Sequence, residues 1–521
     1  MSARRRSLTF PPRLLRSHRP ALRHLLSDLA LGAIAALGLA PFGIWALTPI
    51  ALSVLIWRMA RAPFAGTAFW HGLAGGMGWF ALAMLWIVEP FLVEPEIYGW
   101  MAPFALILMA LGGAMFWAVP GWIAARLVPD WRARSLALTA GLILSDWLRG
   151  WIFTGLPWAL IGHVWTDTPV AQLAAYSGAI GLTALTLIMA LLPVLIRRPV
   201  AQPVLRFLPG AVLSILLLAG SWATGLARLA APLPADTATR LRIVQPNAAQ
   251  HLKWDIAWSE EFFRRLMQLS SEPGARDLVI WPETAVNFLL NDAGEVLPAM
   301  SQAADAPLAL GIQRREGSRY YNSLAMIQPG GAVGQVYDKF HLVPFGEYVP
   351  WGDALSQIGI GAFAAQQGHG YSAGPGPMIL DQPGIPAFQP LICYEAVFPQ
   401  HLRGLERRPE WLLQATNDAW FGKISGPYQH LAQARLRAIE TGLPLIRAAN
   451  TGVSAVIDAH GQIRDSLPLG VQGKIDAALP SALPETPWLR IGPAPVVGAA
   501  LTALFLAGIW SRRHRRHDRP T

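Results

Sequence analysis

The hydrophobic and polar positions divide the chain into an apolar first half and a mixed second half. Up to about residue 230 the sequence consists mostly of apolar runs of about 20 residues, the length that crosses a hydrocarbon layer of roughly 30 Å. The pattern predicts membrane-spanning helices near residues 25–41, 43–60, 66–92, 98–127, 135–153, 170–196 and 207–228. A further apolar run at 488–510 returns the chain to the membrane, so we expect about eight spans.

Between residues 240 and 480 the pattern changes to short β-rich segments, turns and amphipathic helices. The predicted strands are Leu241–Gln245, Leu278–Trp281, Leu308–Ile312, Ser323–Ile327, Gln335–Tyr337, Pro390–Cys393, Trp411–Ala415, Leu445–Ala448 and Ser454–Asp458. Helices are expected near 255–270, 294–304, 398–408 and 427–441. This alternation predicts an α/β domain of layered sheets and helices. The long connection at 351–377, rich in Gly and apolar residues, is expected to be a mobile lid.

Positive charge is concentrated at the two ends of the chain. The basic tails 1–24 and 511–521 flank apolar spans, whereas a nucleic-acid-binding protein usually carries its charge on a folded face. We therefore expect no nucleic-acid partner. Arginines also follow the second, fourth and sixth predicted spans, and only acids occupy the loop after the third. The positive-inside rule then predicts cytoplasmic termini and a 240–480 domain on the outer side.

Three segments of the 240–480 domain carry candidate chemistry. They are the strand Leu278–Trp281 with Pro282 and Glu283, the stretch Tyr337–Glu347 with Lys339, and Pro390–Glu395 with Cys393, the single cysteine of the chain. A cysteine nucleophile needs a base and a nearby cation, and Glu283 and Lys339 can supply them. Each residue alone has an ordinary explanation: a buried thiol, a surface carboxylate or a solvated ammonium. Only their combination predicts a site.

These segments, in this order, resemble the carbon–nitrogen hydrolase (nitrilase) superfamily, and with the membrane helices the chain resembles the apolipoprotein N-acyltransferase family. The matching strings are Trp147–Trp158, Val244–Asn247 with Lys253–Trp254, the three segments above, Ala415–Gly422, Gly426–His430 and Arg447–Gly452. The resemblance implies an αββα sandwich in which Glu283 is the general base, Lys339 the oxyanion-stabilising cation and Cys393 the nucleophile.

The same resemblance implies supporting or substrate-binding roles for further residues, namely Glu347, Trp254, Tyr394, Glu395, Trp147 and Arg149. Trp147 and its neighbouring tryptophans could equally form an interfacial aromatic belt. Arg149 could meet a lipid head group or bond to Asp146, which stands where the family pattern has Glu.

The implied reaction is ping-pong acyl transfer in a bacterial inner membrane, with the catalytic domain in the periplasm. A phospholipid donates a fatty acyl chain to Cys393 as a thioester, and the N-terminal amine of a diacylated apolipoprotein accepts it. Lys339 and a backbone N–H, expected at Tyr394, would hold the oxyanion. No metal or other cofactor is expected, because no Cys/His cluster has metal-ligand spacing.

Two other functions stay open on sequence grounds. A membrane-tethered amidase or nitrilase-type hydrolase would use the same three residues, although one span would suffice to anchor it. A transporter or receptor would place ionisable residues or broken helices along a central path, and few ionisable residues lie inside the predicted spans.

Overall fold

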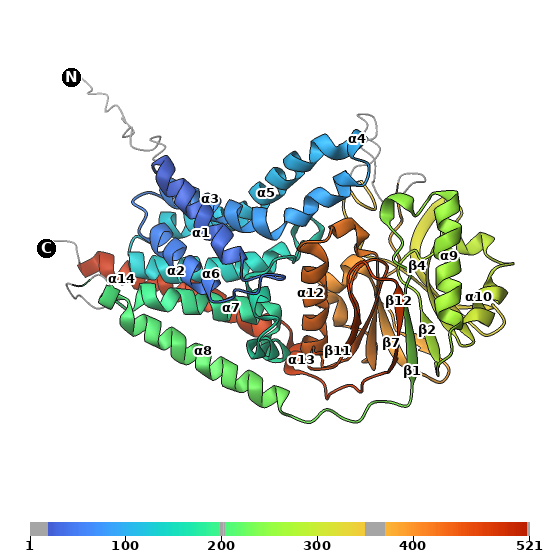
Figure 1. Ribbon diagram of the computed structural model, residues 1–521. Helices are drawn as coiled ribbons and strands as arrows, with labels where there is room; N and C mark the ends of the chain where they lie inside the picture. Colours follow the sequence, from blue (N-terminus) through green and yellow to red (C-terminus); the bar gives the residue numbers. More distant parts are fainter. Residues whose placement is uncertain (1–18, 198–201, 203, 350–369, 518–521) are drawn as a thin grey trace, which may run out of the picture.

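The computed structural model describes residues 19–197, 202, 204–349 and 370–517 (Figure 1). Two parts lie side by side: a helical domain of residues 22–229 with the last helix of the chain, and a sandwich domain of residues 240–478. The main helices of the first part are α1 (Leu22–Ala36), α2 (Leu47–Ala60), α3 (Ala65–Ala83), α5 (Ala102–Leu127), α6 (Trp131–Arg149), α7 (Ala174–Leu195), α8 (Leu208–Leu229) and α14 (Ala494–His517).

Not every expected span is long and apolar enough to cross a membrane on its own. Four helical segments of the described chain are, namely Pro95–Leu127, Pro169–Leu195, Leu208–Leu229 and Ala494–Ser511. A fifth is obtained if α3 and the following 3-10 helix η2 (Leu85–Leu92), bent by 49°, count as one span. Helices α1 and α2 have only 15 and 14 residues, and α6 carries four charged residues. The helical membrane domain is therefore present, while the count of eight stays a prediction.

The expected helix 170–196 is broken near its start. Gly178 has φ 65 and ψ −175, which interrupts α7 one turn after it begins. A Cβ there would lie 2.2 Å from the indole nitrogen of Trp488, so only glycine fits. The N–H of Ala179, left without an intrahelical partner, donates to Glu440 of the sandwich domain at 2.8 Å. The break therefore ties the two domains together.

The second part contains two six-stranded sheets. Its strands are β1 (Arg240–Gln245), β2 (Leu278–Ile280), β3 (Leu308–Glu316), β4 (Arg319–Ile327), β5 (Val333–Asp338), β6 (Leu380–Gln382), β7 (Ile385–Ile392), β8 (Trp411–Thr416), β9 (Leu445–Ala449), β10 (Ser454–Ile457), β11 (Ile463–Leu467) and β12 (Gly473–Ala478). The strand orders are β12-β1-β2-β3-β4-β5 and β11-β10-β9-β8-β7-β6. Parallel pairs at the centre of each sheet put the ends of β2, β7 and β8 at one edge of the sandwich.

Helices cover the outer face of each sheet, which gives the expected αββα layers (Figure 1). Helices α9 (Ile256–Ser271) and α10 (Leu297–Ala304) cover the first sheet, and α12 (Gly426–Thr441) covers the second. Three short or edge strands, β6, β11 and β12, were not predicted. The predicted helix at 398–408 was wrong: only a 3-10 turn, Pro399–Leu402, forms there.

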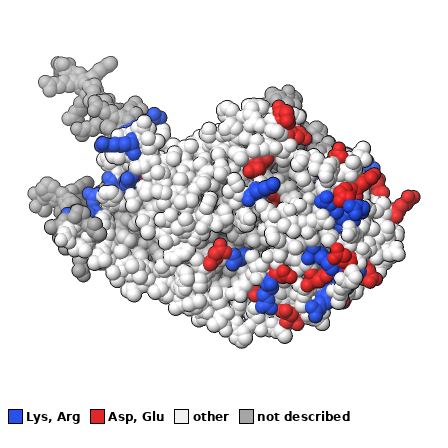
Figure 2. Space-filling view, in the orientation of Figure 1, with Lys and Arg blue, Asp and Glu red and all other residues white. Residues whose placement is uncertain are grey.

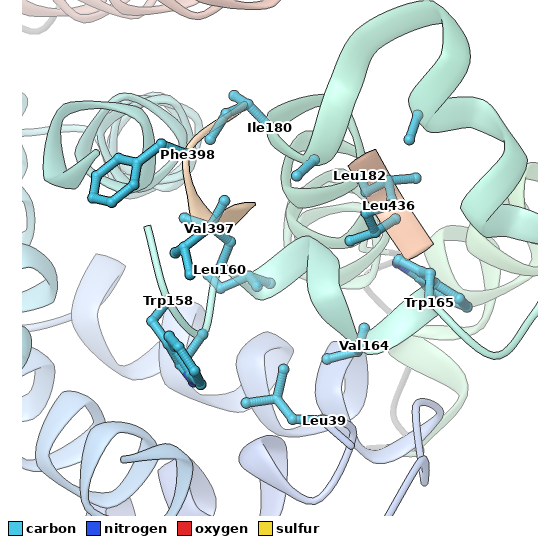
Figure 3. Packing of buried hydrophobic residues seen from close by; sticks show 14 of the residues in the cluster. Leu39, Trp158, Leu160, Val164, Trp165, Ile180, Leu182, Val397, Phe398 and Leu436 are labelled. Carbon is cyan, nitrogen blue, oxygen red and sulfur yellow. The ribbon is translucent and has the colours of Figure 1, made fainter. Parts of the chain in front are cut away.

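Helix α12 lies between the second sheet and the helical domain. Its side chains are almost all buried, because one face packs on the sheet and the other meets α7 and the short helix α13 (Pro487–Ile491). Figure 3 shows Trp158 and Leu160 of the helical domain close to Val397 and Phe398 of the sandwich domain. One continuous core therefore runs from the membrane helices into the sandwich.

The surface repeats this division. On the face seen in Figure 2, Asp, Glu, Lys and Arg gather over the sandwich domain, while most of the helical domain is free of charge, apart from basic residues near the chain ends and acidic residues near α4 (Pro95–Tyr98). An apolar surface of this kind suits a lipid environment. The predicted lid at 351–377 lies for the most part outside the described residues.

Candidate active site

Cys393 follows the end of β7 and begins the 3-10 turn η10 (Cys393–Val397). It has φ 51, a left-handed conformation that is unusual for any residue other than glycine, and its side chain is buried. Burial, and then the charge of Glu283, raise the pKa of the Cys393 thiol; Lys339 and a hydrogen bond with Thr416 oppose this. The thiol is thus neutral at rest and needs a base to react.

Glu283 lies just beyond the end of β2, where the sequence placed it. Its Oε2 accepts the backbone N–H of Asn417 at 2.8 Å, and its Oε1 accepts the side-chain amide of Asn322 at 2.7 Å. Nζ of Lys339 lies 3.4 Å from the same Oε1. These donors fix the orientation of the Glu283 carboxylate.

Lys339 follows β5 and is only 1% exposed. Its Nζ donates to Glu347 at 2.8 Å, and Glu347 in turn accepts the N–H of Val343 through its second oxygen at 2.8 Å. Burial opposes the charge of Lys339, but Glu347 and Glu283 outweigh it and raise its pKa well above the usual value. The ammonium therefore keeps its charge throughout the physiological range.

Asn322 on β4 is a residue of this site that the sequence reading missed. Its amide donates to both Glu283, at 2.7 Å, and Glu347, at 3.2 Å, so one side chain aligns two carboxylates. It is 2% exposed, in a strand that is buried from Tyr321 onward. Asn322 and its neighbour Ser323 are polar residues at the start of a buried apolar segment, and this pair was the signal that could have identified the site.

Glu395 joins the loop that carries Cys393 to the loop that carries Lys339. One carboxylate oxygen accepts the N–H groups of Phe340 and His341, and the other accepts the Tyr337 hydroxyl and the Ile392 N–H, at distances of 2.7 to 3.2 Å. Burial raises its pKa to about 7 in spite of these donors. Its surroundings are therefore backbone and Tyr337 rather than an open pocket.

Tyr394 connects the site to the helical domain. Its hydroxyl donates to the carbonyl of Gly155 at 3.1 Å, and its ring lies 4.9 Å from that of Phe398. Trp254 is half-buried, and its neighbour Lys253 is buried. Burial lowers the pKa of Lys253 to about 8, although the charge of Glu283 opposes the shift. A second lysine thus lies within electrostatic range of the candidate base.

The membrane-side residues have structural partners. Arg149 is 3% exposed; it donates to the carbonyls of Leu156, Trp158 and Ala159 and to Asp146, at 2.5 to 3.3 Å. Of the two readings of Arg149, the geometry favours the bond to Asp146. Trp147 is partly buried and its ring lies 6.4 Å from that of Trp151.

The structure thus brings Glu283, Lys339, Glu347 and Cys393 into one buried cluster and places Glu395 and Tyr394 beside it. Within the described ranges no group of three His, Cys, Asp or Glu side chains could hold a metal ion. The arrangement offers a thiol, a carboxylate base and a fixed cation, which are the parts needed for acyl transfer through a thioester.

Known proteins resemble this chain over nearly its whole length. Residues 31–192 match the model of the apolipoprotein N-acyltransferase N-terminal domain, and residues 240–484 match that of the carbon–nitrogen hydrolases. An apolipoprotein N-acyltransferase of Bradyrhizobium diazoefficiens is 37% identical over 95% of this chain and 96% of its own length. The chain belongs to the apolipoprotein N-acyltransferase family.

Other members of the family are similarly related. The Rhizobium etli protein is 38% identical over 88% of this chain and 90% of its own, and the Brucella suis protein is 34% identical over 96% and 98%. Among solved structures, a CN-hydrolase superfamily protein from Xanthomonas campestris is 22% identical, with a TM-score of 0.35, over 52% of this chain and 97% of its own. An amidase from Nesterenkonia is 17% identical, with a TM-score of 0.35, over 51% and 97%.

Proposed function

We propose that this protein transfers a fatty acyl chain from a phospholipid to the N-terminal amine of the diacylglyceryl cysteine of apolipoproteins. One observation carries the proposal. A buried thiol, a carboxylate and an ammonium lie together at the edge of the sandwich that adjoins the helical domain, joined to it by the Tyr394–Gly155 hydrogen bond. Lipid held by the helices could reach this edge without leaving the membrane.

In the first half-reaction Glu283 takes the proton of the Cys393 thiol, and the thiolate attacks the ester carbonyl of the phospholipid. The negative charge that develops on the carbonyl oxygen is stabilised by the ammonium of Lys339. The tetrahedral intermediate breaks the carbon–oxygen bond, and the lysophospholipid leaves as an alcohol with the proton from Glu283. The acyl chain stays on Cys393 as a thioester.

In the second half-reaction the neutral amine of the lipoprotein cysteine attacks the thioester. Glu283 accepts the proton that this nitrogen loses, Lys339 again stabilises the oxyanion, and the Cys393 thiolate leaves. The thiolate then recovers its proton from Glu283. The lipoprotein carries away an amide, and the enzyme returns to its starting state with no metal or other cofactor.

We place the protein in a bacterial inner membrane with both termini in the cytoplasm and the sandwich domain in the periplasm. The basic tails and the alternating charge of the loops support this orientation. It would put the thiol beside the lipids and lipoproteins of the outer leaflet.

Mass spectrometry of the intact protein after exposure to phospholipid vesicles tests the proposal. We expect an added mass equal to one acyl group, located on the peptide that contains Cys393 and lost on treatment with hydroxylamine. The Cys393→Ala variant should show none, and adding a diacylated lipopeptide should discharge the adduct to the peptide amine. Absence of the adduct in the unmodified protein, or hydrolysis of a small amide in its place, would favour the tethered amidase instead.

A further inference from the structure

A fully buried polar network lies behind Cys393 and takes no part in the proposed reaction. Its members are Gln414, Thr416, Asp418, His430 and Arg447, and each has an exposed fraction of 0%. Buried polar groups of this density are retained only where their hydrogen bonds are satisfied, and a satisfied network fixes geometry. We therefore expect this network to fix the position of the residues that it contacts.

The hydrogen bonds determine where its protons lie. Arg447 donates to Oε1 of Gln414 at 2.6 Å, which turns the Gln414 amide nitrogen toward the carbonyl of Cys393, 3.2 Å away, and toward Nε2 of His430, 2.9 Å away. Arg447 also bonds to Asp418. One arginine thus orients both the amide and the carboxylate.

Asp418 and His430 complete the assignment. Burial opposes the charge of Asp418, but Arg447 and His430 outweigh it and lower its pKa to about 2. Burial and Arg447 lower the pKa of His430, so its ring is neutral. Its Nδ1 lies 3.0 Å from Asp418, and its Nε2 lies 2.9 Å from the Gln414 amide nitrogen and 3.1 Å from the Cys393 carbonyl.

This network contacts both the carbonyl and the thiol of Cys393. Gln414 and Nε2 of His430 lie 3.2 and 3.1 Å from the carbonyl oxygen, and the Thr416 hydroxyl bonds to the thiol. A left-handed conformation is strained for a residue other than glycine and persists only where the surroundings fix it. The network supplies that fixation at φ 51.

The network is in turn held by the helical domain. Trp158 is fully buried, and its ring lies 5.6 Å from that of His430. Its indole N–H donates to Gln429, the neighbour of His430 on α12, at 2.6 Å, and its carbonyl is held by Arg149 at 2.5 Å. Figure 3 shows Trp158 within the core shared by the two domains.

We propose that Trp158 and His430 are positioning residues through which the packing of the helical domain sets the reactivity of Cys393. The inference rests on the proposed role of Cys393 as nucleophile and Glu283 as base. In this proposal the membrane helices help to position Cys393, in addition to holding lipid. Trp158 would act through its contacts with His430 and Gln429.

Alkylation of the full-length protein in detergent by iodoacetamide tests the inference without any lipid, and the single cysteine makes the labelling unambiguous. At pH 7.5 the alkylation rate depends on how closely the Cys393 thiol is held to Glu283, whereas at pH 10 hydroxide removes the thiol proton. Entry of the reagent affects both rates equally. The ratio of the rate at pH 7.5 to the rate at pH 10 therefore reports the position of the thiol relative to Glu283. The Glu283→Gln variant gives the ratio in the absence of the proposed base.

We expect Trp158→Phe and His430→Gln each to lower this ratio about fivefold or more. Trp151→Phe, a change at a 53% exposed tryptophan on the same membrane segment, should leave it within twofold. Thr416→Val should lower the ratio and Thr416→Ser should restore it, which a purely structural role would not produce. Thermal unfolding in parallel identifies any variant that fails to fold.

Folded Trp158→Phe and His430→Gln proteins with the ratio of the unmodified protein would overturn the inference while leaving the proposed function standing. If only His430→Gln lowered the ratio, the link to the helical domain would be wrong. An unchanged ratio in Glu283→Gln would instead refute Glu283 as the base, and the proposed function would fail first.

Discussion

The ammonium of Lys339 lies 2.8 Å from Glu347 and 3.4 Å from Glu283, so the carboxylate that mainly holds the lysine differs from the one proposed as base. Glu347 is fixed by the Val343 N–H and by Asn322, which suits a permanent counter-charge. Glu283 can then gain and lose a proton without releasing the cation. One carboxylate thus holds the lysine, which leaves the other available for the proposed proton transfer.

Glu347→Gln should therefore destabilise the protein and slow acyl transfer while leaving Glu283 in place. Removing one partner of a buried pair costs about 3–5 kcal/mol, and the remaining contact with Glu283 will reduce that figure. The raised pKa of Lys339 stabilises the folded state at pH values below its usual pKa, and this stabilisation is lost as pH rises through the folded value. In the variant that loss should begin at a lower pH, as measured by thermal unfolding. The exposed Glu295→Gln is the matched control; equal behaviour of the two variants would refute the role of Glu347.

Glu395→Gln probes the connection between the loops that carry Lys339 and Cys393. The amide keeps one acceptor oxygen but turns an N–H₂ group toward backbone donors, so we expect a loss of about 1–3 kcal/mol and a lower acyl-transfer rate. A carboxyl whose pKa is raised to about 7 in the folded state makes the protein less stable as pH rises from about 4.5 to 7. The variant should lack that part of the pH dependence. A thermal-unfolding profile with the same slope in both proteins would contradict the prediction.

The fold could be predicted where a local pattern determines it. The central strands appear in the sequence as apolar runs that stop at or just before Glu283 and Cys393. Because these strands are parallel to their neighbours, their ends meet at one edge of the sandwich. Strand β11 could not be found this way, because it is exposed along most of its length and has no alternating pattern. The break at Gly178 depends on Trp488, more than 300 residues later, and no local signal reports it.

The same reasoning applies to the site. Cys393, Glu283 and Lys339 could be named because each lies in a recognisable string. Asn322 and Trp158 act through partners far away in the sequence, so only the folded chain shows what they hold. The predicted span at α6 falls short because it carries charged residues, of which Asp146 and Arg149 pair inside the bundle, whereas α1 and α2 fall short in length.

Gly155→Ala tests the contact between the helical domain and Tyr394. Gly155 has φ 90, and a Cβ there would lie 2.4 Å from the carbonyl oxygen of Gly150 and 2.9 Å from the ring of Phe398. The loop must shift, and the carbonyl that accepts the Tyr394 hydroxyl shifts with it, so we expect kcat to fall about tenfold. Gly384→Ala is the control, because it has φ 81 but open space around the added carbon. Similar losses in both variants would mean that backbone strain alone is responsible.

Arg149→Lys distinguishes a structural arginine from one that binds a lipid head group. The guanidinium bonds to Asp146 and to three carbonyls, and an ammonium cannot reproduce that planar arrangement. We expect the melting temperature to fall by several degrees, while the apparent KM for phospholipid in the folded fraction stays within twofold. Arg126→Lys, at an exposed arginine on α5, should change neither quantity. A variant with an unchanged melting temperature and a KM raised about tenfold would contradict this, because it would show that the charge of Arg149 is used on the substrate rather than on the loop that carries Trp158.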